Sequence, residues 1–440
     1  MTCQFIPPYL LDRIAASLPD DPCYPDSLVL DREFRRRRRS RGERSGAGPV
    51  PDAAAAWVVH TAGNETTLPG TPARSAGQPE SGDVAVDEAA FGVAGSLALF
   101  SEIYDRSSYD DAGATVRATA HYGRDYVNAF WDGEQLVFGD GDDRIFDRFT
   151  KPVDVLGHEF THAVVEYAAG LAYEGQPGAL NESVADAFAA CLKQRLLAQT
   201  PDQADWLIGA ELFRAGIDAR ALRDMARPGT AYDAPALGAD PQVGHMDDYV
   251  ETTDDNGGVH INSGIPNRAF HLAAKAIGGN TWAGAGGIWY AALAGDDVGP
   301  DTDFAGFAAA TIAAAGDHAD AVSQAWADVG VTTGGRHRRP GPAESPGSGR
   351  EVVAVRRSGG FIGSTVIGEV DLDRPDDDRV GELRSLVDRI DLTNVAGGRP
   401  YPDMYSYEFD LRGSHVTVPE HELTPELRRL AELVLADLSR

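Results

Sequence analysis

Two histidines and a glutamate in the segment His158-Glu159-Phe160-Thr161-His162 have the spacing of a metal site. Residues i and i+4 lie on one face of an α-helix, so His158 and His162 could bind the same ion. Glu159 would then lie beside a metal-bound water and could take a proton from it. A helix is indicated by a possible stop at Gly170 and by apolar residues at helical spacing, namely Val155, Phe160, Ala163, Val164 and Tyr167.

A second helical pattern, running from near Asn181 to about Ala198, contains carboxylates that could complete this site. A catalytic zinc ion takes three protein ligands and keeps one position open, and Glu182 can be the third ligand. Asp186, one turn later, can accept the other ring N–H of a ligating histidine and so fix its tautomer. The two segments predict a hydrolytic zinc site, whereas the alternative interpretation is a solvated helix with two unrelated histidines.

Four separated motifs resemble the thermolysin family of zinc metalloendopeptidases, in the family's order, between about Leu68 and Val331. The zinc helix with its following turn matches residues 158–164 and 170–173, and the third-ligand helix matches residues 178–183. The segment of the second catalytic histidine matches residues 255–264. The strand and loop that bind substrate match residues 128–131 and 139–142. The resemblance implies an α+β, two-lobe fold with the zinc ion between a sheet-rich lobe at 57–150 and a helical lobe at 151–331.

The same resemblance implies roles for individual residues near the zinc ion. Tyr173 and His260 would donate hydrogen bonds to the oxyanion of the tetrahedral intermediate. Asp255 would hold His260 in the imidazolium form or in the correct tautomer. Glu159 would be the general base and would later deliver a proton to the leaving nitrogen.

Further residues match positions that bind the substrate in that family. Arg223 would bind a carbonyl on the primed side, and Asn128 with the backbone of Ala129 would hold the peptide as an added strand. The lining of the S1′ pocket implies cleavage before bulky apolar residues and is matched by Phe146, Val155 and Leu222.

One departure from the family concerns calcium, which these enzymes often bind beside the third-ligand helix. Asp154 and Asp205 match two of the carboxylates involved. Three other ligand positions hold residues that do not suit a calcium ion, namely Lys193, Leu207 and Ala210. We therefore expect no double calcium site, and expect the Lys193 ammonium to replace an ion.

Composition and charge limit the classes of function that this chain can have. The 440-residue chain has a net charge of −29, which argues against a nucleic-acid partner, and no apolar run is expected to span a membrane. Its three cysteines give no disulfide framework. No standard signal peptide is recognised at the N-terminus, so secretion by a leaderless route is favoured by the family resemblance, with a cytoplasmic location as the alternative.

Residues 1–50 differ from the enzyme lobes. Pro7-Pro8-Tyr9-Leu10-Leu11 resembles the short propeptide of the protealysin group within the family, and the five arginines Arg35–Arg39 form a solvated run open to proteolytic nicking. The resemblance implies a pro-segment that covers the cleft until it is cut. A nucleic-acid-binding arm is the alternative, which the acidity of the chain disfavours.

Residues 332–350 have the composition of a flexible linker, and residues 351–440 form a separate small α+β domain. The segments 356–361 and 402–407 resemble emfourin, a small protein inhibitor of protealysin-type enzymes. A tethered inhibitor acts at an effective concentration in the millimolar range. The alternative is an accessory binding module.

The leading interpretation is a zinc endopeptidase made as a latent precursor, acting on polypeptides and inhibited by both ends of its own chain. An inactive peptide-binding scaffold would be expected to lack Glu159 or a zinc ligand, and none is lost. A zinc hydrolase of non-peptide substrates is disfavoured by Asn128 and Ala129.

Overall fold

The computed structural model describes residues 4–19, 21–41, 55–332, 352–359, 366–372, 379–387, 389–390, 405–411 and 414–435. The chain divides into two units, Met1–Arg338 and Arg339–Arg440, each with its own apolar core. The linker predicted at 332–350 lies outside the described residues except for Thr332.

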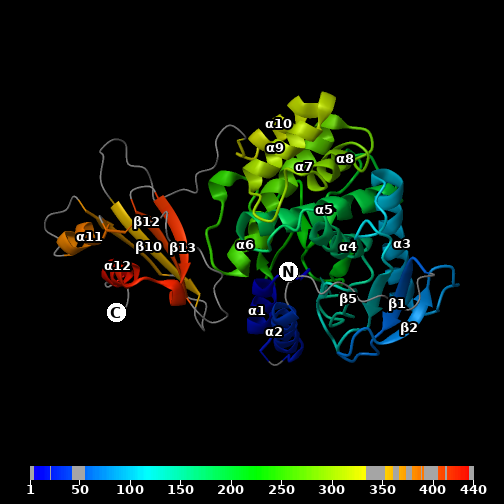
Figure 1. Ribbon diagram of the computed structural model, residues 1–440. Helices are drawn as coiled ribbons and strands as arrows, with labels where there is room; N and C mark the ends of the chain where they lie inside the picture. Colours follow the sequence, from blue (N-terminus) through cyan, green and yellow to red (C-terminus); the bar gives the residue numbers. More distant parts are fainter. Residues whose placement is uncertain are drawn as a thin grey trace. The chain divides into compact units, whose positions relative to one another are not determined.

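The first lobe of unit 1 is a mixed five-stranded sheet in the order β2-β1-β3-β5-β4 (Figure 1). Its strands are β1 (Trp57–Thr61), β2 (Thr71–Ser75), β3 (Val116–Ala120), β4 (Ala129–Trp131) and β5 (Leu136–Phe138). β3 lies parallel to both β1 and β5, whereas β4 is antiparallel to β5. β4 is therefore an edge strand of the sheet, with which an extended segment can pair.

α3 (Val84–Tyr104) packs against this sheet and against the helical lobe. The Asp83 side chain accepts hydrogen bonds from the backbone N–H groups of Ala85 and Val86, which satisfies the N-terminus of the helix. By length and composition alone α3 could cross a membrane, and it is the one such helix among the described residues. Half of its most apolar window is buried in the protein, as is usual for a core helix.

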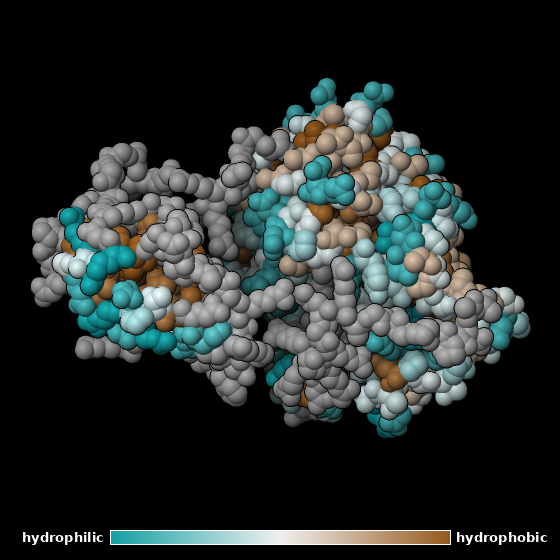
Figure 2. All heavy atoms as spheres, viewed as in Figure 1, coloured by the Kyte–Doolittle hydropathy of each residue, from teal (hydrophilic) through white to brown (hydrophobic). Residues whose placement is uncertain are grey.

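The second lobe is mainly helical. Its helices are α4 (Val153–Tyr167), α5 (Gly175–Leu196), α6 (Asp255–Asn262), α7 (Gly264–Ile277), α8 (Ala285–Leu293), α9 (Phe304–Ala314) and α10 (Ala319–Ala327). Short strand pairs join β6 (Leu207–Ile208) to β7 (Arg223–Asp224) and β8 (Asp233–Ala234) to β9 (Gly238–Ala239). Figure 2 shows mildly hydrophobic residues over α7 to α10, in keeping with their many alanines.

Gly170 ends the helix that carries the paired histidines. It has φ +64°, and its N–H donates to the Val165 carbonyl at 2.8 Å beyond the last turn of α4. A left-handed glycine is the usual way to close a helix C-terminus, as expected at this position.

Two N-terminal helices, α1 (Pro8–Ser17) and α2 (Cys23–Arg41), pack against each other and are drawn in blue in Figure 1. Arg35–Arg39, expected as a solvated run open to proteolytic nicking, lies within the last turns of α2.

Unit 2 contains an antiparallel sheet in the order β11-β10-β12-β13. Its strands are β10 (Val352–Gly359), β11 (Val366–Asp371), β12 (Tyr405–Leu411) and β13 (Ser414–Pro419), and its helices are α11 (Val380–Val387) and α12 (Pro425–Leu435). Thr424 caps α12 by accepting the N–H of Leu427 at 3.2 Å, as its sequence suggests.

Candidate metal centre and substrate cleft

The two predicted helices bring His158, His162 and Glu182 together. One ligand atom from each residue lies within 4.8 Å of the others, and all three side chains are buried. His158 and His162 come from one face of α4, and Glu182 comes from the neighbouring helix α5. The Nε2 atoms of the two histidines are 2.9 Å apart, and Glu182 oxygens lie 3.4 and 3.6 Å from them.

The hydrogen bonds behind these histidines fix which nitrogen faces the centre. His158 Nδ1 is 2.8 Å from Asp186 Oδ1, and His162 Nδ1 is 2.8 Å from Asn181 Oδ1. Asn181 Nδ2 donates to the Leu171 carbonyl, so its Oδ1 is the atom that accepts from His162. Both Nδ1 atoms therefore donate, and both Nε2 lone pairs converge with the Glu182 carboxylate on one point.

These three side chains are placed so that they could hold a metal ion. Burial alone would lower the pKa of His158, but Asp186 and Glu182 outweigh it and raise that pKa to about 9. Burial and the neighbouring His158 lower the pKa of His162 to about 3. Two nitrogens and a carboxylate oxygen, with each histidine fixed from behind, are a donor set suited to zinc.

Glu159 lies on α4 between the two histidines and is completely buried. The backbone N–H of Trp131 acts on its carboxylate, and this contact only partly offsets the effect of burial on its pKa. Burial raises the pKa of Glu159 to about 8, which makes the carboxylate a stronger base. The arrangement suits a group that takes and returns a proton near neutral pH.

Asp186 is held by a buried arginine as well as by His158. Arg223 Nε and Nη2 donate to its two oxygens at 2.7 and 2.8 Å, and Asn267 Nδ2 donates to Oδ2 at 2.9 Å. Burial would raise the pKa of Asp186, but Arg223 and His158 outweigh it and lower that pKa to about 2. Asp186 thus remains an anion that orients His158 and Arg223 together.

A tight turn brings His260 to the same centre. Asn256, Gly257 and Gly258 have positive φ, and added side-chain atoms at the two glycines would collide with neighbouring groups. Asp255, at the start of the turn, lies 2.6 Å from His260 Nδ1 and also accepts the backbone N–H of His260 at 2.9 Å. Burial alone would lower the pKa of His260, but the carboxylates of Asp255 and Glu182 raise it.

Tyr173 joins this group, as expected from its position after α4. Its hydroxyl donates to Glu182 Oε1 and lies 3.4 Å from His260 Nε2. The two predicted oxyanion donors are thus adjacent to each other and to a metal-ligand candidate.

A segment of the chain's own N-terminus lies in the cleft along the edge strand β4. Phe5 N–H donates to the Ala129 carbonyl at 3.0 Å, and Ile6 N–H donates to Asn128 Oδ1 at 2.8 Å. Asn128 Nδ2 donates back to the Ile6 carbonyl at 3.2 Å, and Arg223 Nη1 donates to the Phe5 carbonyl at 3.3 Å. Asn128, Ala129 and Arg223 therefore contact a polypeptide backbone in this structure.

The Phe5 side chain lies in an apolar environment beside the metal centre. Its ring meets the His158 ring edge-on at 5.1 Å, and the Arg223 guanidinium lies 4.8 Å from its centroid. The predicted S1′ residues Phe146, Val155 and Leu222 are buried in the same apolar cluster as Phe5. Gly209 is near both Leu222 and the Phe5 ring, and a Cβ atom there would lie about 3.3 Å from each.

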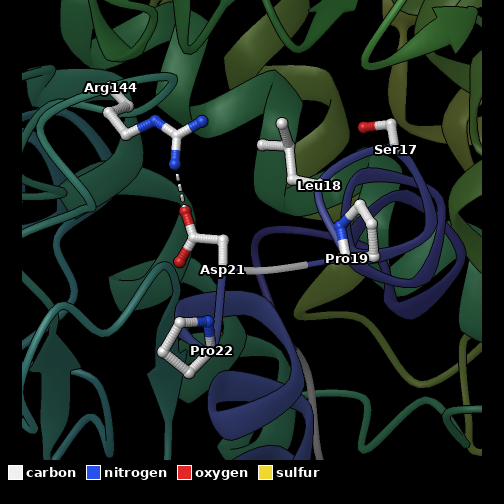
Figure 3. A pocket seen from close by; sticks show the side chains of 6 residues that line it. All are labelled: Ser17, Leu18, Pro19, Asp21, Pro22 and Arg144. Atoms are coloured by element: carbon white, nitrogen blue, oxygen red, sulfur yellow. Dashed lines mark hydrogen bonds and ion pairs between the residues drawn. The ribbon is translucent and has the colours of Figure 1, made fainter.

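α2 adds a second anchor through Asp31, which is fully buried. Its carboxylate accepts from the Tyr126 hydroxyl at 2.5 Å and from Asn128 Nδ2 at 3.1 Å. Close to the α1–α2 turn, Asp21 pairs with Arg144 at the rim of a pocket lined by Leu18, Pro19 and Pro22 (Figure 3).

Lys193 lies where the family resemblance would put calcium. Its Nζ is 3.1 and 3.0 Å from the Asp205 carboxylate oxygens, 3.0 Å from the Leu207 carbonyl and 3.5 Å from Asp154 Oδ2. Burial would lower the pKa of Lys193, but Asp154 and Asp205 raise it. Ala210 begins the neighbouring 3-10 turn Ala210–Leu212 and offers no carboxylate.

Sequence reasoning gave no role to Asn181, Asn267, Asp31 or Gln4–Ile6. Asn181 precedes the predicted ligand Glu182, and a helical projection could have raised it as a partner for His162. The other three contact the site over 81 to 256 residues of sequence, and no local signal marks them.

Three family models match the chain. Residues 58–166 match the catalytic domain and residues 169–331 the alpha-helical domain of thermolysin metallopeptidases, and residues 355–435 match Emfourin. The chain therefore carries an emfourin-like domain after the peptidase lobes, as predicted.

Relatives extend this similarity over most of the chain. An extracellular metalloprotease of Pectobacterium carotovorum is 48% identical over 336 residues, covering 75% of this chain and 96% of that protein. Protease PrtS of a Photorhabdus species is 46% identical over 280 residues, covering 62% of this chain and 76% of that protein.

The solved structure of a precursor of protealysin, a metalloproteinase from Serratia proteamaculans, is 45% identical, with a TM-score of 0.68. It is matched over its full length and covers 75% of this chain. The predicted two-lobe α+β fold and the enzyme class are confirmed, and the chain belongs to the thermolysin family of metalloproteases.

Proposed function

We propose that the chain is a zinc-dependent neutral endopeptidase made as a latent precursor. The observation that carries this proposal is the peptide segment Gln4–Ile6, bound through its backbone beside the acceptor cluster of His158, His162 and Glu182. An inactive scaffold would also bind a peptide, but it would have no need of the buried carboxylate of Glu159 beside the metal-ligand candidates.

The residues of this chain have distinct tasks in the proposed reaction. Zinc, held by His158, His162 and Glu182, would lower the pKa of water and polarise the scissile carbonyl. Glu159 takes a proton from the attacking water and delivers it to the leaving nitrogen.

Attack by water places a negative charge on the oxygen of the scissile carbonyl. His260 has a carboxylate at Nδ1 and a carbonyl oxygen at Nε2, an arrangement that supports donation from both nitrogens. With Tyr173 it stabilises the oxyanion, and Asp255 keeps it charged and oriented.

Substrate binding follows from the contacts of the edge strand. Asn128 and the Ala129 carbonyl hold the peptide backbone, and Arg223 holds the carbonyl of the residue after the scissile bond. The apolar surroundings of the Phe5 ring, with Phe146, Val155 and Leu222 in the same cluster, support cleavage before bulky apolar residues.

Latency is supported by the occupied cleft. The N-terminal segment takes the hydrogen bonds that a substrate backbone would need from Asn128, Ala129 and Arg223. A segment covalently tied to the site competes at high effective concentration. The emfourin-like unit acts as a second, tethered inhibitor in this proposal, on the strength of its family match.

The zinc mechanism is tested by replacing Glu159 with Gln. The variant should keep one zinc per chain, because no ligand is changed, but should lose hydrolysis of casein by about 10²–10⁴-fold, the usual contribution of a general base. Zinc content is measured by atomic absorption and turnover after removal of the pro-segment.

A matched control is Glu166→Gln, on the same helix. Its side chain accepts from Trp131 Nε1 at 2.9 Å, and the amide oxygen can still do so. Casein hydrolysis at the wild-type rate by the zinc-loaded Glu159→Gln variant would show that another residue activates the water.

A further inference from the structure

We infer that the Gln4–Phe5 peptide bond is a self-cleavage site: the enzyme hydrolyses its own pro-segment there, and the cut chain remains latent. The inference rests on the proposed endopeptidase function and names one bond that this function acts on. It derives from the direction and register in which the N-terminal segment occupies the cleft.

The carbonyl of each residue in the segment has a different donor. His260 Nε2 lies 3.0 Å from the Gln4 carbonyl oxygen, Arg223 donates to that of Phe5, and Asn128 donates to that of Ile6. His260 is the donor proposed for the developing oxyanion. Among the described residues of the segment, the Gln4 carbonyl is therefore the one placed where a scissile carbonyl would lie.

The contacts of Phe5, on the C-terminal side of the Gln4–Phe5 bond, also place this bond at the position of a scissile bond. The Phe5 nitrogen, which would become the leaving amine, donates to the Ala129 carbonyl at 3.0 Å. The Phe5 ring lies against the metal-ligand candidate His158 in the apolar pocket proposed to bind the residue after the cut. A bulky apolar residue thus follows the bond, as the proposed specificity requires.

The reaction consumes one water. Its oxygen bonds to the Gln4 carbonyl carbon, the C–N bond to Phe5 breaks, and Glu159 transfers the two water protons, one after the other, to the Phe5 nitrogen. The products are a carboxylate on Gln4 and an ammonium on Phe5. Because the bond is held in place before reaction, the step is intramolecular and its rate does not depend on protein concentration.

The cut does not free the cleft. Ile6 keeps its bonds to Asn128, and Leu10, Leu11 and Ile14 of α1 are fully buried against the peptidase core. Asp31 of α2 also remains bound to Asn128 and Tyr126. The four N-terminal residues leave, while the rest of the pro-segment still occupies the primed side.

The test follows the N-terminus of the full chain, loaded with zinc, by intact mass and N-terminal sequencing over time. A product that begins at Phe5 should accumulate before any cut elsewhere, with the same half-time over a 100-fold dilution series. The Glu159→Gln chain should keep the Gln4–Phe5 bond. Phe5→Leu should be cut at the same bond, whereas Phe5→Asp should slow the cut by at least about tenfold, because it buries a charge.

Two outcomes would overturn the inference. One is a first cut elsewhere while Gln4–Phe5 stays intact, and the other is a half-time that shortens in proportion to protein concentration. A parallel sample, trypsin-treated at the arginine run, is assayed on an added peptide. Hydrolysis there with an intact Gln4–Phe5 bond in the untreated chain removes only this inference, whereas no hydrolysis in either sample removes the proposed function as well.

Discussion

At the scale of single residues, the proposed metal centre depends on side chains other than the three candidate ligands. Asn181 and Asp186 each hold one histidine by its Nδ1, which turns both Nε2 lone pairs to a common point. Asn181 itself is fixed by the Leu171 carbonyl. The orientation of the ligands is therefore set by hydrogen bonds that the fold supplies before an ion binds.

Replacing Asn181 with Ala should weaken zinc binding by about 10–100-fold, since His162 loses the acceptor that fixes its tautomer. The measurement is a competition titration against a zinc chelator. Asn181→Asp keeps an acceptor at the same place and should lose less affinity. Equal affinity of the Ala variant and the wild type would show that His162 is held by other groups.

Residue types at fixed spacing made part of this site predictable. His158, His162 and Glu159 follow from the geometry of one helix, and the structure brings Glu182 to them from the next helix. The spacing of residues could not predict that Asn267 and Arg223 contact Asp186, because these contacts join residues 81 and 37 apart in the sequence.

At the scale of elements, an ammonium joins α4 to α5 and to the strand pair β6–β7. Lys193, on α5, contacts Asp154 of α4 and the residues Asp205 and Leu207. Burial raises the pKa of Asp154, so its negative charge needs a nearby cation. This arrangement supports the expectation that Lys193 takes the place of a metal ion.

Lys193→Met should lower the unfolding temperature of the peptidase unit by roughly 5–10 °C, since it leaves a buried carboxylate without its cation. Addition of calcium or of a calcium chelator should leave the wild-type value unchanged. Both are measured by differential scanning calorimetry on zinc-loaded protein.

Lys275→Met is the control for that measurement, because the Lys275–Asp202 pair is exposed and should contribute little. A calcium-dependent rise in the wild-type unfolding temperature would contradict the proposed role of Lys193.

The hydrogen bonds from Tyr126 and Asn128 to Asp31 of α2 give a second prediction at this scale. Asp31→Ala removes the acceptor for Tyr126 and Asn128, and should weaken pro-segment binding by about 2 kcal/mol, the contribution of a hydrogen-bonded buried charge. The full chain should then show roughly 30-fold higher initial turnover of a short peptide. Asp26→Ala changes an exposed residue of the same helix and should leave turnover at the basal level.

The sequence predicts some helices and segments of the structure but not others. The helices around His158 and Glu182 follow from apolar spacing. The helical conformation of the arginine run could not be anticipated, because composition reports charge but not the position of a helix end. The occupant of the cleft could be anticipated only by family resemblance, since its contacts join residues 122 and 256 apart.

At the scale of the whole molecule, unit 2 has its own sheet and core and follows the peptidase unit in one chain. Deleting residues after about 335 should raise the activity of the pro-segment-free enzyme, because a tethered inhibitor acts at millimolar effective concentration. The assay is turnover of a peptide substrate. Unchanged turnover in the truncated enzyme would favour an accessory binding module instead.

The edge strand β4 has a consequence for the life of the protein after activation. An edge strand that accepts an extended peptide can also accept the unfolded segments of other copies of the same chain. While Phe5 and Ile6 occupy it, that edge is closed to such pairing. We expect the N-terminal segment to shield this edge of the sheet, and expect its removal to expose activated molecules to mutual digestion and to aggregation.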